Sequence, residues 1–233
     1  MGRFKGMIAA LGIAVAGAGP VVAQDSPVVV ELFTSQGCSS CPPADALLAE
    51  LGDREDVIAL ALHVDYWDYI GWKDVFAQHA FTKRQKAYAR TGGWKMIYTP
   101  QMVVNGVDDV VGSRSMKLAD LIQKHADRPR TVDLRVARAG DHLTIRAEAL
   151  GQVRPCDIHV VVYMPRKEVE ITRGENAGRT LTYTNVATNW TVAGRWDGKG
   201  VYEGRVRLDG ALPVIVLVQD PDNGHIEAAA RLR

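Results

Sequence analysis

Apolar and polar residues follow one pattern before residue 128 and another after it. Apolar runs at Val28–Phe33 and Val57–Val64, each interrupted by a single polar residue, predict two buried strands. Apolar residues at helical spacing predict helices over Ala44–Asp53 and Lys73–Thr91, the second with Val75, Phe76, Ala80 and Ala87 towards the core. Two strands around an Asn-Gly turn and a closing amphipathic helix complete an expected β-α-β-α-β-β-α order. These last three elements are expected over residues 101–104, 107–111 and 115–127.

Beyond Asp127–Arg130, which is typical of a linker, the apolar period becomes two. Seven segments of this kind, separated by turn residues, predict seven strands and favour a β-sandwich. We therefore expect an α/β unit over residues 24–128 and an all-β, sandwich-like domain over residues 129–233. The polar stretch Arg173–Val186 is expected to be a long connection that carries either function or an interdomain contact.

Composition and charge narrow the possible partners. The chain has 233 residues, of which 47% are hydrophobic and 24% charged, so it can build one large core or two small ones. The formal net charge is +1, and lysine and arginine form no long run. Because a nucleic-acid-binding surface needs a basic patch or stripe, nucleic acid is not expected as a partner.

Residues 1–23 are typical of a secretory signal peptide. Arg3 and Lys5 precede an apolar stretch, Met7–Ala18, and small residues precede Ala23. We expect cleavage after Ala23 and a periplasmic or secreted protein with no membrane span. The alternative is an uncleaved anchor, because residues 6–24 carry no charge.

Export changes how the three cysteines are interpreted, since disulfides persist in an oxidising compartment. Cys38 and Cys41 are separated by two residues and lie between a predicted strand and a predicted helix. A structural staple across so short a loop would contribute little, because disulfide stabilisation grows with loop length. Redox chemistry is therefore the favoured use of the pair. Cys156 is expected to be a buried, inert thiol, with a third redox role as the alternative.

Pro42 and Pro43 follow the pair and lack the backbone N–H that a helix interior requires. They place the start of the regular helix near Cys41, one turn later than a helix that began at Cys38. A thiolate at a helix N-terminus is favoured by the helix dipole, so this placement bears directly on the acidity of Cys38.

The strand, the Cys-Ser-Ser-Cys motif and the later Thr99-Pro100 resemble the thioredoxin fold over Val28–Asp127. The resemblance implies that Cys38 is the exposed attacking thiol and Cys41 the buried resolving thiol. It implies a cis Pro100 beside the disulfide, with Thr99 pairing with the substrate chain, where an ordinary trans proline is the alternative. It also implies Glu31 as proton acceptor for Cys41; otherwise Glu31 is a strand-end charge facing solvent.

With the β-domain that follows it, the opening VELFTSQGCSSCPPAD resembles a family of uncharacterised secreted bacterial thioredoxin-like proteins. The resemblance implies an envelope thiol–disulfide oxidoreductase that acts on protein thiols or disulfides and exchanges electrons with an unidentified redox partner. The direction of the reaction stays open, and neither a cofactor nor a metal is expected.

The alternative function is a non-enzymatic periplasmic module that binds copper or a partner protein. Copper would be held by Cys38, Cys41 and His63, because two cysteines and a histidine form a soft ligand set. The segment 63–76 is rich in aromatic residues, and its Tyr66, Trp67 and Trp72 are candidate substrate contacts. Packing of these rings under the next helix and against the second domain is the competing interpretation.

Overall fold

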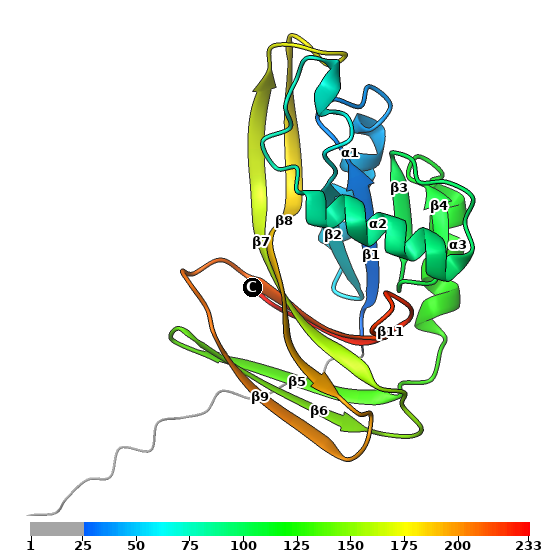
Figure 1. Ribbon diagram of the computed structural model, residues 1–233, viewed down its shortest axis with the longest axis vertical. Helices are drawn as coiled ribbons and strands as arrows, with labels where there is room; N and C mark the ends of the chain where they lie inside the picture. The colour runs from blue at the N-terminus through cyan, green and yellow to red at the C-terminus, as the bar shows by residue number, and fades with distance from the viewer. Residues whose placement is uncertain (1–25) are drawn as a thin grey trace, which may run out of the picture.

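The computed structural model describes residues 26–233 (Figure 1). The predicted signal peptide, residues 1–23, lies outside this range. Within residues 26–233, no helix is long and apolar enough to cross a membrane.

The protein is built on a mixed eight-stranded sheet with the strand order β11-β10-β7-β8-β2-β1-β3-β4, and a three-stranded sheet, β5-β6-β9, packs against part of it. The first half contains β1 (Val28–Thr34), α1 (Pro42–Gly52), β2 (Val57–His63), η1 (Asp68–Ile70), α2 (His79–Gly92), β3 (Gln101–Val104), β4 (Asp108–Val111) and α3 (Ser115–Ala126). The second half contains β5 (Val132–Ala139), β6 (His142–Ala149), β7 (Cys156–Ile171), β8 (Arg179–Trp196), β9 (Val201–Arg207), β10 (Val214–Gln219) and β11 (Ile226–Leu232).

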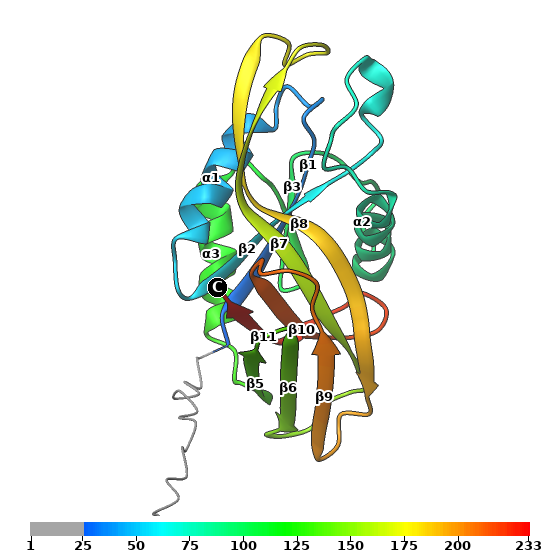
Figure 2. The same cartoon turned by 90° about the vertical axis from the view of Figure 1, so that its left-hand side faces the viewer.

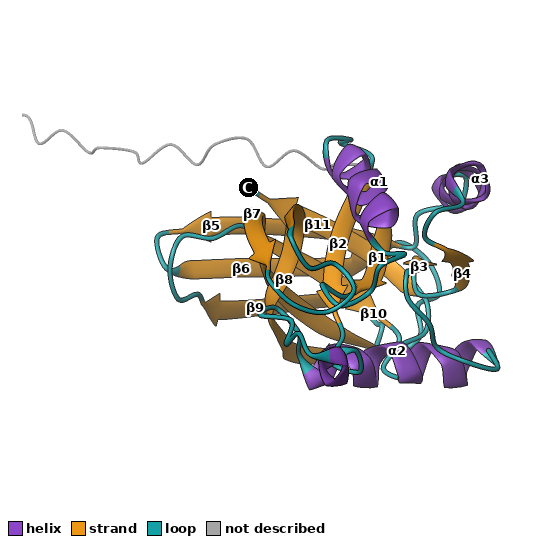
Figure 3. Cartoon of the chain, turned by 90° about the horizontal axis from the view of Figure 1, so that it is seen from above, coloured by secondary structure: helices purple, strands orange, loops and turns teal. Residues whose placement is uncertain are grey.

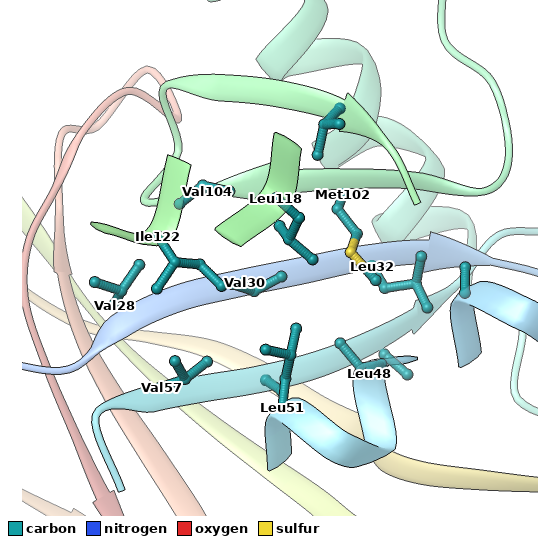
Figure 4. Close-up of a cluster of buried hydrophobic side chains, with 14 of the residues drawn as sticks. Val28, Val30, Leu32, Leu48, Leu51, Val57, Met102, Val104, Leu118 and Ile122 are labelled. Carbon is teal, nitrogen blue, oxygen red and sulfur yellow. The ribbon is translucent and has the colours of Figure 1, made fainter. Parts of the chain in front are cut away.

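Helices cover both faces of the large sheet where it is formed by β1, β2, β3 and β4. Helices α1 and α3 lie on one face and α2 on the other (Figures 2 and 3). Strand β1 serves both faces, because successive side chains of a strand point in opposite directions. Val30 and Leu32 pack with Leu48 of α1 and Ile122 of α3 (Figure 4). Val29 and Phe33 pack into the core on the α2 face.

The seven strands predicted beyond residue 130 are all present, but their sheets differ from the expected separate sandwich. The three-stranded sheet does pack against β7 and β10, through residues such as Leu143, Ile158 and Val216. Strand β8, however, runs beside β2 in parallel, with Ala61 opposite Val186, so one layer of the sandwich is a continuation of the first-half sheet. The physical reason is that β2 would otherwise expose an unpaired edge.

Two predicted segments differ from the structure by more than a few residues. The stretch Arg173–Val186 was expected to be a connection, but β7 extends to Ile171 and β8 begins at Arg179, so a long hairpin joined only by residues 172–178 results. Helix α2 begins at His79 rather than Lys73. Asp74 is buried and accepts a hydrogen bond from the backbone N–H of Phe76 (2.8 Å), which holds this segment in a turn and leaves Val75 and Ala80 exposed.

Candidate redox site

The cysteine pair lies in the loop between β1 and α1 and forms a disulfide, with 5.4 Å between the Cα atoms of Cys38 and Cys41. Two tight turns shape the loop: the Cys38 N–H donates to the Ser35 carbonyl (3.1 Å), and the Cys41 N–H donates to the Cys38 carbonyl (3.2 Å). Cys41 is the N-cap of α1, which confirms the predicted start of the helix. Sγ of Cys38 lies 3.4 Å from the hydroxyl of Ser40, a donor positioned for a thiolate.

The expected exposure of Cys38 is wrong, because Cys38 and Cys41 are both 0% exposed. One cover is the hairpin tip, which we define as residues 172–178 between β7 and β8 (yellow at the top of Figure 1). The side-chain amide of Asn176 donates to the backbone carbonyls of Gln36 (2.9 Å) and Cys38 (3.0 Å). The second half of the chain therefore contributes to the site through the stretch Arg173–Val186, which the sequence had marked for function or an interdomain contact.

A second cover comes from the aromatic segment after β2. The indole N–H of Trp67 donates to Oγ1 of Thr99 (2.7 Å), and that of Trp72 donates to Oε1 of Gln36 (2.9 Å). Tyr66 donates to Gln85 of α2. All three rings are partly buried, and two of them are tied to the loops beside the disulfide. Their contact with substrate stays a prediction.

The Thr99-Pro100 bond is cis, as predicted. The Pro100 carbonyl accepts a hydrogen bond from Gly112 (2.9 Å). A Cβ atom on Gly112 would lie 2.8 Å from Cβ of Ala44 and 3.1 Å from Cβ of Pro100. Pro100 and the first turn of α1 therefore lie close together around this glycine, and residues some sixty positions apart belong to one site.

The solvent-facing interpretation of Glu31 is wrong, and its role as proton acceptor for Cys41 stays a prediction that the geometry does not favour. Glu31 is 0% exposed, and it shares the α2 face with Val29 and Phe33, whereas α1 lies on the opposite face. It accepts hydrogen bonds from Nε of Arg84 (2.7 Å), from Nη2 of Arg84 (3.1 Å) and from the Tyr88 hydroxyl. The Glu31 carboxylate is thus the buried counter-ion of Arg84.

A buried carboxyl group on the same side of the sheet as α1 and the cysteine loop is that of Asp45. Asp45 follows Cys41 by four residues, a spacing that puts two side chains on the same side of a helix. Its Oδ1 accepts a hydrogen bond from Thr34 (2.8 Å), while its buried Oδ2 has no partner among the described residues. Burial is the main cause that raises the pKa of Asp45 to about 7; His63 and the Thr34 hydroxyl oppose the rise, and Asp74 adds to it.

Asp45 belongs to a buried polar cluster beneath the disulfide loop. Thr34 and His63 are register partners on β1 and β2, and the Tyr183 ring lies 4.9 Å from that of His63. Nδ1 of His63 lies 2.7 Å from Oδ2 of Asp74, which also accepts the N–H of Gln36. Nε2 of His63 and the hydroxyl of Tyr183 are buried without a partner among residues 26–233. A buried carboxyl group with unpartnered polar neighbours therefore lies on the α1 side of the sheet.

The copper alternative finds no support in this geometry. Within the part of the chain that the structure describes, no group of three or more His, Cys, Asp or Glu side chains is arranged to hold a metal ion. Nδ1 of His63 is occupied by Asp74, and both cysteines are in the disulfide.

Cys156 is a buried free cysteine that packs in the core between the two sheets, with its thiol directed at the Arg154 carbonyl (3.2 Å). Burial, reinforced by nearby carboxylates, raises the pKa of this thiol to about 12. Such a thiol carries almost no thiolate at neutral pH, which agrees with the predicted inert role.

The fold and the site together define a mixed α/β protein with a buried, two-residue-spaced disulfide at a strand-to-helix junction. The chain belongs to the family described as "protein of unknown function (DUF1223)", which matches residues 29–219.

A solved structure of an Agrobacterium tumefaciens protein has 31% sequence identity, covers 90% of this chain and 96% of that chain, and superposes with a TM-score of 0.77. A superoxide reductase structure also matches, with 10% identity over 45% of this chain and 88% of that chain. Its TM-score of 0.22 is too low to indicate a shared fold. No curated protein matches the chain.

Proposed function

We propose that the protein is a thioredoxin-like thiol–disulfide oxidoreductase of the cell envelope, with Cys38 and Cys41 as its redox couple. The observation that carries the proposal is the disulfide at the N-terminus of α1 with a buried carboxyl group one helical turn after Cys41. Dithiol chemistry needs a thiolate and a proton acceptor, and the proposal assigns these roles to Cys38 and to the Asp45 carboxyl group. The disulfide also supports an oxidising compartment.

In the reducing direction, the Cys38 thiolate attacks one sulfur of a substrate disulfide and releases the other as a thiolate. Cys41 then gives its proton to Asp45 and attacks Sγ of Cys38, which breaks the mixed disulfide and releases the second substrate thiolate. Two electrons pass from the protein to the substrate, and the Cys38–Cys41 disulfide remains. The oxidising direction is the reverse of these steps.

Substrate access follows from the same geometry. Because both cysteines are buried, the hairpin tip or the aromatic segment must move before a disulfide can reach Cys38. The partly exposed Thr99 backbone next to Pro100 is the proposed docking edge for an extended protein chain, with Trp67 and Trp72 beside it. Protein thiols or disulfides in the envelope, and a redox partner that restores the couple, are the proposed partners.

Substitution of the cysteines tests the proposal. Cys41→Ser removes the resolving thiol, so we expect the reduced variant to accumulate a one-to-one mixed disulfide with a peptide disulfide and to lose turnover to the background rate. Cys38→Ser should lose turnover without accumulating the complex. The measurement is non-reducing mass spectrometry together with the rate of peptide reduction by excess dithiothreitol.

The matched control is Cys156→Ala, which removes a thiol outside the site and should retain the turnover of the wild type. A complex that forms equally well with Cys38→Ser, or a wild-type rate no faster than that of dithiothreitol alone, would rule out the redox proposal.

A further inference from the structure

The hairpin tip is fixed to the cysteine loop by a buried side chain. Asn176 is 1% exposed, and its amide group bridges the carbonyls of Gln36 and Cys38. Its own Oδ1 accepts a hydrogen bond from Arg179 of β8 (2.8 Å). Because its donors and its acceptor are all engaged, Asn176 holds the tip in one position relative to Cys38.

The anchored tip brings a negative charge to the same loop. Oε2 of Glu175 accepts the backbone N–H of Ser39, the residue directly after Cys38, at 3.2 Å. Glu175 is 136 positions away in the sequence and is exposed on its other sides. This carboxylate therefore contacts the backbone between the two cysteines, one residue from Cys38.

The contact matters because the Cys38 thiolate has few other donors. A thiolate at a helix N-terminus is stabilised by unpaired backbone N–H groups, and Pro42 and Pro43 have none to offer. Glu175 occupies the N–H of Ser39 and adds a negative charge to the loop between the two cysteines. The hydroxyl of Ser40 is a donor close to the sulfur, at 3.4 Å.

We propose that Glu175, held in place by Asn176, opposes ionisation of Cys38 and thereby sets the redox poise of the couple. The proposal deepens the proposed function and rests on it. Glu175 acts through the thiol and is a positioning residue rather than a catalytic one. When the tip is seated, the disulfide is favoured over the dithiol; when a partner displaces the tip, Cys38 becomes both accessible and more acidic.

The redox balance gives the sign of the effect. Reduction by glutathione consumes two glutathione thiols and yields one protein dithiol and one glutathione disulfide. Anything that stabilises the Cys38 thiolate draws this equilibrium towards the reduced protein. Other charged groups around the site are Asp45 on α1, Asp74 in the loop after β2 and Arg179 on β8, and the test leaves all three unchanged.

The first variant is Glu175→Gln, which keeps the size of the side chain and removes its charge. We expect the pKa of Cys38 to fall, so that its acid dissociation constant rises about threefold. The reason is that a nearby negative charge disfavours the thiolate, and the effect is modest because solvent screens it. The pKa is read from the pH dependence of thiolate absorbance at 240 nm in the reduced protein, with Cys38→Ser as the baseline, because this readout needs no reagent to reach the buried sulfur. When the pH is above the Cys38 pKa of both the wild type and the variant, the equilibrium with glutathione should move towards the reduced protein by the same factor.

Two further variants separate charge from general disturbance. Glu170→Gln makes the same charge change at an exposed position on β7 and should leave the Cys38 pKa unchanged. Asn176→Ala should lower the Cys38 pKa as much as Glu175→Gln does, and the double variant should add nothing. Circular dichroism establishes that each variant is folded.

An unchanged Cys38 pKa and glutathione equilibrium in folded Glu175→Gln would overturn the proposal, as would an equal shift in Glu170→Gln. Both readouts are independent of turnover on a peptide disulfide. If the wild type shows no exchange activity while the pKa shift is present, the proposed function fails and the electrostatic effect of Glu175 stands.

Discussion

Asp45→Asn is expected to stabilise the oxidised protein at pH 8 and to slow the resolution of mixed disulfides by the reduced protein. The carboxyl group is buried, with a pKa of about 7 in place of its ordinary 3.8. A rise of this size corresponds to roughly 4 kcal/mol of free energy that the folded protein loses on ionisation at high pH. Asparagine has nearly the same shape and cannot ionise.

The sign of the stability effect follows from proton binding. Between pH 3.8 and about 7, the unfolded chain has released the Asp45 proton and the folded protein still holds it, so this group makes stability fall as pH rises. Below pH 3.8 both states are protonated and the variant should match the wild type. At pH 8 we expect Asp45→Asn to be more stable by about 2–4 kcal/mol in urea unfolding of the oxidised protein.

Asp53→Asn is the control, since it removes an exposed carboxylate at the other end of α1 and should leave the pH profile of stability unchanged. Parallel profiles of the wild type and Asp45→Asn from pH 4 to 8 would show that Asp45 is not the proton holder. For kinetics, loss of a general base should reduce the rate of Cys41 attack by about 100-fold at pH 7. Stopped-flow decay of a preformed mixed disulfide measures that rate.

The sequence predicts the position of Asp45 relative to Cys41 but not its burial. Its spacing from Cys41 is helical, but an acidic residue in a first helical turn is usually a solvated partner of the helix dipole. Only the strand neighbours Thr34 and His63, together with Tyr183 from the second half, show that the position is buried. The side of β1 that Glu31 occupies follows from strand alternation, because Val29 and Phe33 lie on the same side.

Contacts between distant segments also limit how much of the fold the sequence predicts. Apolar runs predict β1 and β2 well, since a strand buried on both faces shows a continuous apolar signal. The outer part of the β7–β8 hairpin is exposed, and the polar run around Pro165 resembles a loop. The pairing of β8 with β2 is a contact between distant segments, and no local pattern encodes it. For that reason the sequence marked residues 173–186 for function or an interdomain contact but did not indicate which backbone carbonyls Asn176 would bind.

The buried ion pair of Glu31 and Arg84 carries the second large prediction. Arg84→Met should destabilise the protein by about 3–5 kcal/mol, because it leaves the Glu31 carboxylate buried without its counter-ion. The penalty lies in the unpaired charge rather than in lost attraction. Urea unfolding at pH 7 measures it, with Lys83→Met, an exposed neighbour on α2, as the control for loss of a cation.

The double variant Glu31→Leu/Arg84→Met separates the two explanations. It removes both charges from the pair, so we expect it to recover most of the lost stability, less the hydrogen bonds that Arg84 also makes to Gln219 and Asn223. Stability as low as that of Arg84→Met alone would show that packing, not charge, governs the site. Because Glu31 faces α2, the pH dependence of disulfide exchange in the folded double variant should match that of the wild type. A shifted pH profile would restore Glu31 as a proton acceptor and remove that role from Asp45.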